Sequence, residues 1–231
     1  MQIQYFQLIG QIGKTLGKGK PFLLRHIRTE NFYSDTKFDF KNNKFISTKL
    51  YFDHIFNGCE GVDYKELTFQ EFLSIIKQYK QDYSPALYYI ELAKIVCKEA
   101  HKGQVDKAGV DYYLHPYTVA DNLIKAGVKD ADYLAAAYLH DVLEDTAITE
   151  QDLYKFGFNS NIVNAVKLLT HNKADDYYHY LDKVITNPIA LTVKKFDLAH
   201  NMDPTRSASS SPHLQEKYTN AINYIKGKSL W

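Results

Sequence analysis

The segment AYLHDVLEDT, residues 137–146, begins as an apolar helix and then places one imidazole and three carboxylates within six positions. The residues before it are also small and apolar, so ADYLAAAYLH at 131–140 predicts a helix that is buried on most sides at the centre of a helical bundle. Because burial of an unpaired carboxylate is costly, the polar residues here must face water or hold a positive charge. These residues are His140, Asp141, Glu144 and Asp145.

Helix start and stop signals recur along the chain from residue 84 onward and predict a mainly α fold. Proline follows a polar residue at 84–85, 187–188 and 211–212, as is typical of the first turn of a helix. Glycines mark several expected helix ends. The predicted helices run over 85–100, 116–126, 149–156 and 212–227, with two more on either side of 187–188.

Residues 1–82 follow a different pattern, and we expect a small N-terminal α+β attachment there. TKFDFKNNKFISTKL at 36–50 alternates apolar and polar residues on both sides of KNNK, which predicts a β-hairpin. LTFQEFLSIIKQY at 67–79 predicts a helix, because Thr68 and Glu71 have the spacing of a capping box. The predicted domains are therefore 1–82, of unknown role, and 83–231, the helical domain.

Composition excludes several classes of protein. A formal net charge of +1 with interspersed signs favours neither nucleic acid nor an anionic membrane as a partner. The two cysteines, Cys59 and Cys97, form no CxxC pattern and do not fit a disulfide framework or a thiolate metal site. The start MQIQYFQLIG lacks a basic region, and no run of about 18 apolar residues occurs. We expect a soluble, cytoplasmic protein.

The polar groups after the buried helix are spaced as two tiers. His140 and Glu144 are four residues apart, as are Asp141 and Asp145, so on a helix they share one side. His115 precedes a proline, and Asp197 lies one turn before Asn201. Two imidazoles and two carboxylates from three elements suit Mn²⁺, Fe²⁺ or Zn²⁺ rather than Ca²⁺. The alternative is that each residue is a hydrogen-bonded core group or a helix cap, and spacing alone leaves both interpretations open.

Three segments, taken together, resemble a known family. AHKGQVDKAGVDYYLHP at 100–116, AYLHDVLEDT at 137–146 and VKKFDLAHNM at 193–202 are similar, in this order, to the signatures of the HD-superfamily hydrolase domain of RelA/SpoT-type proteins, including small alarmone hydrolases. The resemblance covers about residues 84–227. It implies an all-helical HD-domain bundle that hydrolyses a phosphorylated nucleotide.

The resemblance also implies roles for individual residues. A divalent metal ion, most commonly Mn²⁺, would be held by four of them, two would act on the attacking water, and two would line the nucleotide pocket. The implied metal ligands are His115, His140, Asp141 and Asp197; the implied catalytic residues are Glu144 and Asp145; the implied substrate-binding residues are Lys107 and Asn201.

Two departures from the family pattern spare the metal ligands and concern substrate choice or local salt bridges. Alarmone hydrolases usually carry Arg-Lys after the GQ pair, where this chain has Asp106 and Lys107, and Leu198 follows Asp197 in place of the usual arginine. Loss of the first arginine removes a cationic stacking plane for the base.

The leading hypothesis for function is removal of the 3′-pyrophosphate of ppGpp or pppGpp. One alternative is hydrolysis of another phosphorylated nucleotide, favoured by Asp106 and by the presence of only three arginines. The other is a non-catalytic nucleotide-binding antitoxin or regulator, whose residues 1–82 contact a protein partner or a second copy of the chain.

Overall fold

The computed structural model describes residues 1–8, 22–28, 33–39, 44–47, 64–68, 70–72, 74–75, 85–172, 174–204 and 211–228. The chain forms two compact units. The first comprises Met1–Pro85 and Lys155–Gly157, and the second comprises Ala86–Tyr154 and Phe158–Trp231. The prediction of a mainly helical protein with a small α+β attachment is confirmed.

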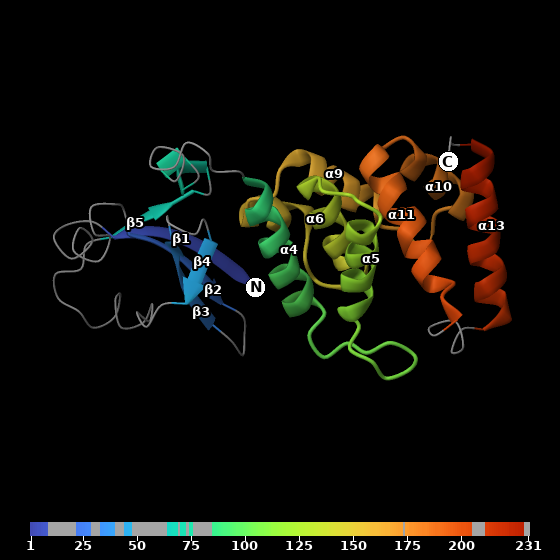
Figure 1. The fold of residues 1–231 in the computed structure, drawn as a ribbon, viewed down its shortest axis with the longest axis horizontal. Helices are drawn as coiled ribbons and strands as arrows, with labels where there is room; N and C mark the ends of the chain where they lie inside the picture. Colours follow the sequence, from blue (N-terminus) through green and yellow to red (C-terminus); the bar gives the residue numbers. More distant parts are fainter. Residues whose placement is uncertain are drawn as a thin grey trace. The chain divides into compact units, whose positions relative to one another are not determined.

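The first unit contains an antiparallel sheet with the strand order β4-β3-β2-β1-β5 (Figure 1). Apolar side chains of β1 and β2 are buried, so these strands contribute the described core of this unit. The predicted hairpin is present, because β3 and β4 pair antiparallel; its KNNK turn lies largely outside the described residues. The strands are β1 Gln2–Leu8, β2 Phe22–Arg28, β3 Tyr33–Asp39, β4 Lys44–Ser47 and β5 Tyr64–Leu67.

The capping box predicted after the sheet is also present. The backbone N–H of Thr68 donates to Glu71 Oε2 at 2.9 Å, and the backbone N–H of Glu71 donates to Thr68 Oγ1 at 3.2 Å. Residues 70–72 and 74–75 are helical. Phe72 from this helical segment is fully buried, with its ring 4.8 Å from that of Tyr5 on β1. The segment is thereby packed against the sheet.

The second unit is a bundle of helices (Figure 1). The α6 helix is its centre: it packs against α5, α9 and α11, and the residues 134–139 are all buried. The short alanine side chains allow the neighbouring helices to approach closely, as the sequence predicted. The helices from residue 85 onward are α4 Pro85–Ala100, α5 Leu114–Lys125, α6 Ala131–Leu139, α7 Val142–Asp145, α8 Glu150–Phe156, α9 Ser160–Leu169, α10 Tyr177–Ile185, α11 Pro188–Asn201 and α13 Pro212–Lys228. Pro85 and the end of α8 belong to the first unit.

Local caps account for the boundaries of these helices. Asn187 accepts hydrogen bonds from the backbone N–H groups of Ile189 and Ala190, so it ends the connection from α10 and begins α11. Gly127 and Gly157 follow α5 and α8 with positive φ angles of 89° and 106°. Such angles suit glycine at a helix C-terminus.

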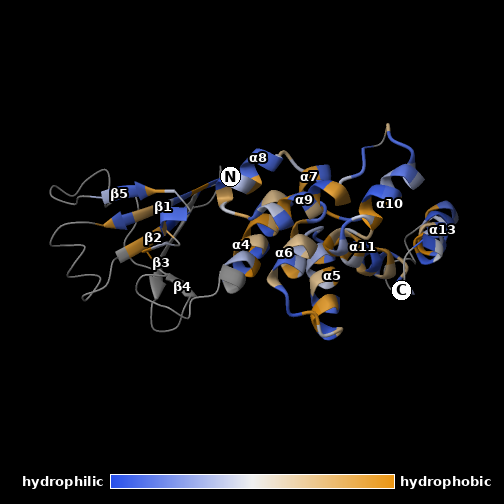
Figure 2. Ribbon diagram, turned by 90° about the horizontal axis from the view of Figure 1, so that it is seen from above, coloured by the Kyte–Doolittle hydropathy of each residue, from blue (hydrophilic) through white to orange (hydrophobic). Residues whose placement is uncertain are grey.

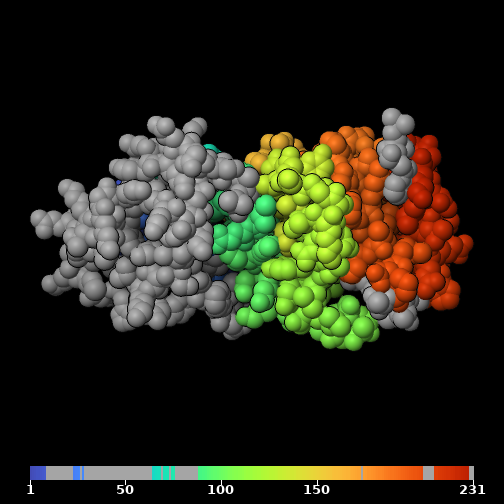
Figure 3. All heavy atoms as spheres, in the orientation of Figure 1, coloured from blue at the N-terminus to red at the C-terminus, as the bar shows by residue number. Residues whose placement is uncertain are grey.

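The last helix, α13, lies beside α10 and α11 (Figure 3). Its sequence is largely hydrophilic (Figure 2), and among its side chains Ala221 and Ile225 are buried. It therefore covers one side of the bundle with few apolar contacts and leaves polar side chains available at its surface. Within the described ranges, no helix has the length and apolar character needed to cross a membrane.

Candidate metal and nucleotide site

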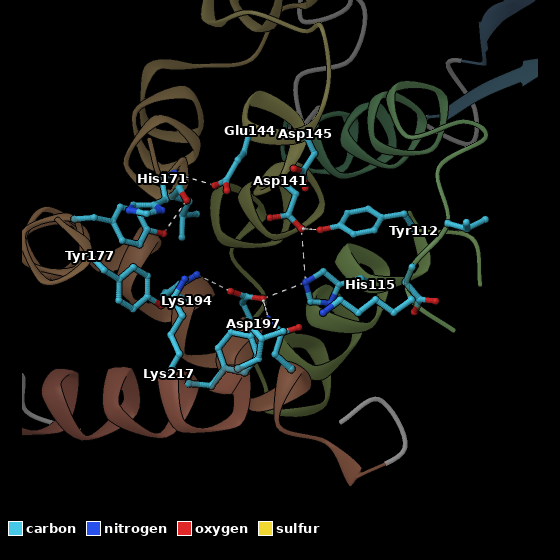
Figure 4. Close-up of a pocket in the computed structure, with 18 residues that line it drawn as sticks. Tyr112, His115, Asp141, Glu144, Asp145, His171, Tyr177, Lys194, Asp197 and Lys217 are labelled. Carbon is cyan, nitrogen blue, oxygen red and sulfur yellow. Dashed lines mark hydrogen bonds and ion pairs between the residues drawn. The ribbon is translucent and has the colours of Figure 1, made fainter. Parts of the chain in front are cut away.

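A cavity of about 390 Å³ lies within the second unit, and most of the predicted site residues line it (Figure 4). Tyr112 and His115 stand on one side, and His171 and Tyr177 stand on the other. Seven of the eight predicted site residues contribute to the wall: Lys107, His115, Asp141, Glu144, Asp145, Asp197 and Asn201. The eighth, His140, is buried close behind the wall.

The His-Asp pair lies at a junction between two helices rather than inside one. The α6 helix ends at Leu139, and α7 begins at Val142. His140 Nδ1 lies 2.8 Å from the backbone oxygen of Ala137, the carbonyl that would accept the Asp141 N–H in an uninterrupted helix. The expectation that residues 140–145 share one helix is therefore corrected. The interruption leaves His140 buried, while Glu144 and Asp145 are exposed.

Four donor atoms from the predicted ligands form a closed ring. The Nε2 atom of His115 lies 3.0 Å from Asp197 Oδ1 and 3.6 Å from Asp141 Oδ2. The Nε2 atom of His140 lies 3.1 Å from Asp141 Oδ2 and 3.7 Å from Asp197 Oδ1. Ligand atoms about 2.1 Å from one transition-metal ion are about 3.0–3.4 Å apart. Two of the four distances lie within this range and two are slightly longer. Within the described residues, His115, His140 and Asp197 form the group whose donor atoms all lie within 4.8 Å of one another, and Asp141 adjoins this group through its contacts with both imidazoles.

The orientation of His140 leaves a lone pair facing this ring. Because a carbonyl oxygen can only accept, the contact with Ala137 places the imidazole proton on Nδ1. The Nε2 atom is buried and, among the described residues, has no hydrogen-bond partner. An imidazole lone pair directed at two carboxylate oxygens is unfavourable unless a positive charge, either a cation or a proton on Nε2, lies between them. This orphaned nitrogen is the observation that best fits a bound metal ion.

Electrostatics also favour a positive charge at this position. Burial disfavours the imidazolium form of His140, yet the adjacent Asp141 outweighs burial and raises the pKa of His140 to about 10. His115 differs from His140. Burial lowers the pKa of His115 despite the nearby carboxylates and favours the neutral imidazole, the form that can bind a metal ion. The ring thus offers two imidazoles and two carboxylates, a donor set that suits Mn²⁺, Fe²⁺ or Zn²⁺.

Asp197 is held by three neighbours on α5 and α11. Its Oδ1 accepts a hydrogen bond from Asn201 Nδ2 at 2.7 Å in addition to the contact with His115. Its Oδ2 forms an ion pair with Lys194 Nζ at 2.8 Å. Burial raises the pKa of the Asp197 carboxyl, but Lys194 and the imidazoles outweigh burial and hold it well below its usual range. Asp197 is consequently an ionised and oriented carboxylate.

The second acidic pair faces the cavity from α7. Glu144 Oε2 accepts a hydrogen bond from the backbone N–H of His171 at 2.8 Å. Partial burial and the neighbouring Asp141 raise the pKa of the Glu144 carboxyl. Gln104 Nε2 donates to the backbone oxygen of Asp145 at 2.8 Å, which ties the end of α7 to the loop before α5.

Lys107 belongs to a tight turn. The turn is stabilised by Asp106, the residue that replaces the usual arginine of the family. Asp106 Oδ1 accepts hydrogen bonds from the backbone N–H groups of Ala108 and Val110 at 2.9 and 3.0 Å. Gly109, with a φ of 80°, donates its N–H to the backbone oxygen of Asp106. This is the pattern of a β-turn that begins with aspartate and ends with glycine. Asp106 therefore stabilises the turn next to Lys107.

Several cavity residues were not among the sequence predictions. Lys194 lies three residues before Asp197 on α11, a helical spacing that could have identified it. Tyr112 donates its hydroxyl to Asp141 Oδ2 at 2.9 Å. Lys217 reaches the cavity from α13, with Nζ 4.2 Å from the ring centroid of Tyr177. No local sequence pattern marks Lys217, because the packing of α13 brings it there.

Comparison with known proteins finds a family whose model matches part of the helical unit. Residues 93–187 match the HD domain family. The predicted resemblance to HD-superfamily hydrolases of the RelA/SpoT type is confirmed. The matched range includes the His-Asp pair and ends before Asp197.

Curated relatives match a little more than half of the chain. It is 31% identical over 139 residues to the bifunctional (p)ppGpp synthase/hydrolase SpoT of Escherichia coli, covering 55% of this chain and 20% of that protein. It is 31% identical over 150 residues to the guanosine-3′,5′-bis(diphosphate) 3′-pyrophosphohydrolase of Spiroplasma citri, covering 60% and 20%. The chain thus spans about a fifth of the length of these relatives.

A solved structure shares the fold. It is described as a metazoan ortholog of SpoT that hydrolyses ppGpp and plays a role in starvation responses, and it superposes with a TM-score of 0.51 at 20% sequence identity. The match covers 59% of this chain and 83% of that chain. At this identity the likeness supports the fold alone.

Proposed function

We propose that this chain, an HD-superfamily member of the RelA/SpoT type, is a metal-dependent phosphohydrolase that removes the 3′-pyrophosphate of ppGpp or pppGpp. The observation that carries the proposal is the ring of donor atoms from His115, His140, Asp141 and Asp197, with the buried Nε2 of His140 directed into it. The curated relatives named as pyrophosphohydrolases support the substrate class.

The ring would hold one divalent cation, and Mn²⁺ is the proposed species. Such an ion lowers the pKa of bound water and neutralises charge on the attacked phosphoryl group. The protein supplies the orientation of its ligands: Tyr112 holds Asp141, and Asn201 and Lys194 hold Asp197.

Glu144 and Asp145 are proposed to act on the attacking water. Both line the cavity from α7, one turn beyond the His-Asp pair. The raised pKa of Glu144 suits a group that accepts a proton near neutral pH. The contact with the backbone N–H of His171 fixes one of its oxygens and leaves the other available to a water molecule.

Lysines on the cavity wall support a polyanionic substrate. Burial and the neighbouring Lys194 lower the pKa of Lys217, so two ammonium groups are close enough to repel each other. Lys107 contributes a third from its turn. Phosphate groups between these lysines would relieve the repulsion. Asn201 lines the same wall, and we assign Lys107 and Asn201 to substrate binding.

Asp106 favours a second candidate substrate within the same reaction class. Since its carboxylate closes its own turn, this position offers no cationic plane for stacking on guanine. A different 3′-phosphorylated nucleotide is therefore the alternative substrate. A cytoplasmic location, the absence of nucleic-acid and membrane partners, and a protein or self-contact through residues 1–82 stay predictions.

The test is a product analysis with the full chain. Wild type and Asp141→Ala are incubated with Mn²⁺ and a panel of nucleotides that includes ppGpp, and pyrophosphate, phosphate and nucleotide products are identified. We expect pyrophosphate from ppGpp with wild type, and neither metal retention nor turnover with Asp141→Ala. Asp121→Ala, at an exposed position on α5, is the matched control.

Each result decides between the candidates. Cleavage of another nucleotide but not ppGpp would select the alternative substrate. Binding of nucleotide without any cleavage would select a non-catalytic regulator. Full activity in Asp141→Ala would reject the assigned metal site.

A further inference from the structure

The proposed ligand His115 contacts a second imidazole that neither the sequence nor the comparisons assign. His115 Nδ1 lies 2.8 Å from Nδ1 of His200, and the two ring planes are within 14° of each other. His200 is on α11, three residues after Asp197, and is partly exposed. The α11 helix therefore supplies Asp197, which contacts Nε2 of His115, and His200, which contacts Nδ1 on the other side of the same imidazole.

Only one proton can occupy the hydrogen bond between two Nδ1 atoms. Whether His115 or His200 carries this proton determines whether His115 can bind a metal ion. If His200 donates, the proton of neutral His115 is on Nε2 and points at Asp197 Oδ1, 3.0 Å away. If His115 donates, its Nε2 carries a lone pair directed at the ring. Only the second arrangement allows His115 to bind a cation.

His140 has the equivalent contact in a simpler form. Its Nδ1 meets the backbone oxygen of Ala137, which can only accept, so its tautomer is fixed by the main chain. His115 has an imidazole in the equivalent place, and an imidazole nitrogen can donate or accept. The tautomer of His115 therefore depends on His200. Outer partners of this kind orient metal-binding histidines and raise their basicity.

We propose that His200 is a positioning residue for the metal site: its Nδ1 accepts the Nδ1–H of His115 and thereby directs the Nε2 lone pair of His115 at the cation. The proposal rests on the metal-binding function proposed above and adds a residue to it. His200 carries its own proton on Nε2 in this arrangement.

Two substitutions separate the hydrogen bond from the ring contact. His200→Phe keeps an aromatic ring beside His115 but removes the acceptor, whereas His200→Asn removes the ring and can place an amide oxygen near the position of Nδ1. His179→Phe, at an exposed position on α10, is the matched control. The full-length proteins are titrated with Mn²⁺ alone and followed by electron paramagnetic resonance, with thermal melting as a check on folding.

We expect His200→Phe to weaken Mn²⁺ binding by about 10–100-fold, the usual cost of losing such a partner. His200→Asn should retain most of the affinity, and His179→Phe all of it. In wild type loaded with diamagnetic Zn²⁺, nitrogen NMR should show the His115 proton on Nδ1. This second measurement does not depend on the folding of any variant.

Several results would overturn the assignment. Equal affinity in both His200 variants, equal loss in both, or loss in His200→Asn alone would show that the acceptor is not what matters. A His115 proton on Nε2 in the Zn²⁺ form would do the same. Failure of wild type to bind either ion would overturn the metal-binding function together with this inference, and is distinguishable because the control protein would fail equally.

Discussion

The two units of the molecule use polar side chains in different ways. In the described part of the first unit, the contacts among Lys65, Thr68 and Glu71 are local and close the start of one helical segment. In the second unit, polar groups far apart in sequence meet in the interior: His115 and Asp197 are 82 residues apart. Local contacts stabilise the end of a single helix. Buried polar contacts between residues far apart in sequence bring side chains of several helices together, and this arrangement indicates a bound ligand.

The largest effect on the metal site is expected when the charge of Asp197 is removed. Asp197→Asn should weaken Mn²⁺ affinity by more than the roughly 100-fold upper range for an outer partner, and turnover should be lost. It should also lower the melting temperature, since the largely buried ammonium of Lys194 loses its carboxylate partner. Mn²⁺ titration and thermal melting measure the two effects.

A double variant separates these two effects. Asp197→Asn combined with Lys194→Met removes the unpaired buried ammonium and should restore much of the melting temperature. Metal affinity should stay low, because the carboxylate is still missing. Recovery of Mn²⁺ binding in the double variant would mean that Asp197 serves only as the partner of Lys194.

Within the second unit, Glu144 should separate metal binding from catalysis. Glu144→Gln keeps the size of the side chain but removes its basicity, so turnover should fall about 10²–10⁴-fold. Mn²⁺ affinity should be nearly unchanged, because Glu144 is outside the ring of donor atoms. Glu216→Gln, exposed on α13, should change neither. If Glu144→Gln lost Mn²⁺ affinity and turnover in parallel, Glu144 would itself be a metal ligand.

Tyr112 gives a smaller effect on the same site. Tyr112→Phe removes the hydroxyl that donates to Asp141 Oδ2, and a hydrogen bond to a charged group at the low end of its range corresponds to about tenfold weaker Mn²⁺ binding. Tyr113→Phe is the matched control, since the Tyr113 ring lies beside Tyr117 and Lys98. Equal Mn²⁺ affinities for the two variants would show that the Tyr112 hydroxyl does not contribute to metal binding.

Most of the helical fold was predictable because its signals are local. Thr149 and Asp152 form the capping box at α8, and Asn187 caps α11, both as their spacing indicates. The break between α6 and α7 was not predicted, since it depends on the His140 side chain taking the carbonyl of Ala137. A side chain that competes with the main chain in this way leaves no trace in hydrophobic periodicity.

The site was predictable where short motifs carry it and unpredictable where packing does. The three motifs led to every donor atom of the ring, whereas Lys217 reaches the cavity only because α13 packs on α10 and α11. Asp106 was interpreted from the sequence as the loss of a cationic stacking plane for the base. Its spacing from Gly109 is typical of a turn, and the structure shows its carboxylate bonded to that turn.

The smallest expected effect lies in the first unit and concerns the local polar contacts that cap its helical segment. Hydrogen bonds from Lys65 and Thr68 lower the pKa of the Glu71 carboxyl from 4.5 to about 2. Because the pKa is depressed by folding, the cap stabilises the unit above pH 4.5 and this contribution is lost as the pH falls through about 2. Carboxyl NMR should give a Glu71 midpoint near 2, raised by Lys65→Ala. Glu71→Ala should leave Mn²⁺ affinity unchanged; a changed affinity would show that the local contacts of the first unit influence the metal site, and the contrast between the two units would fail.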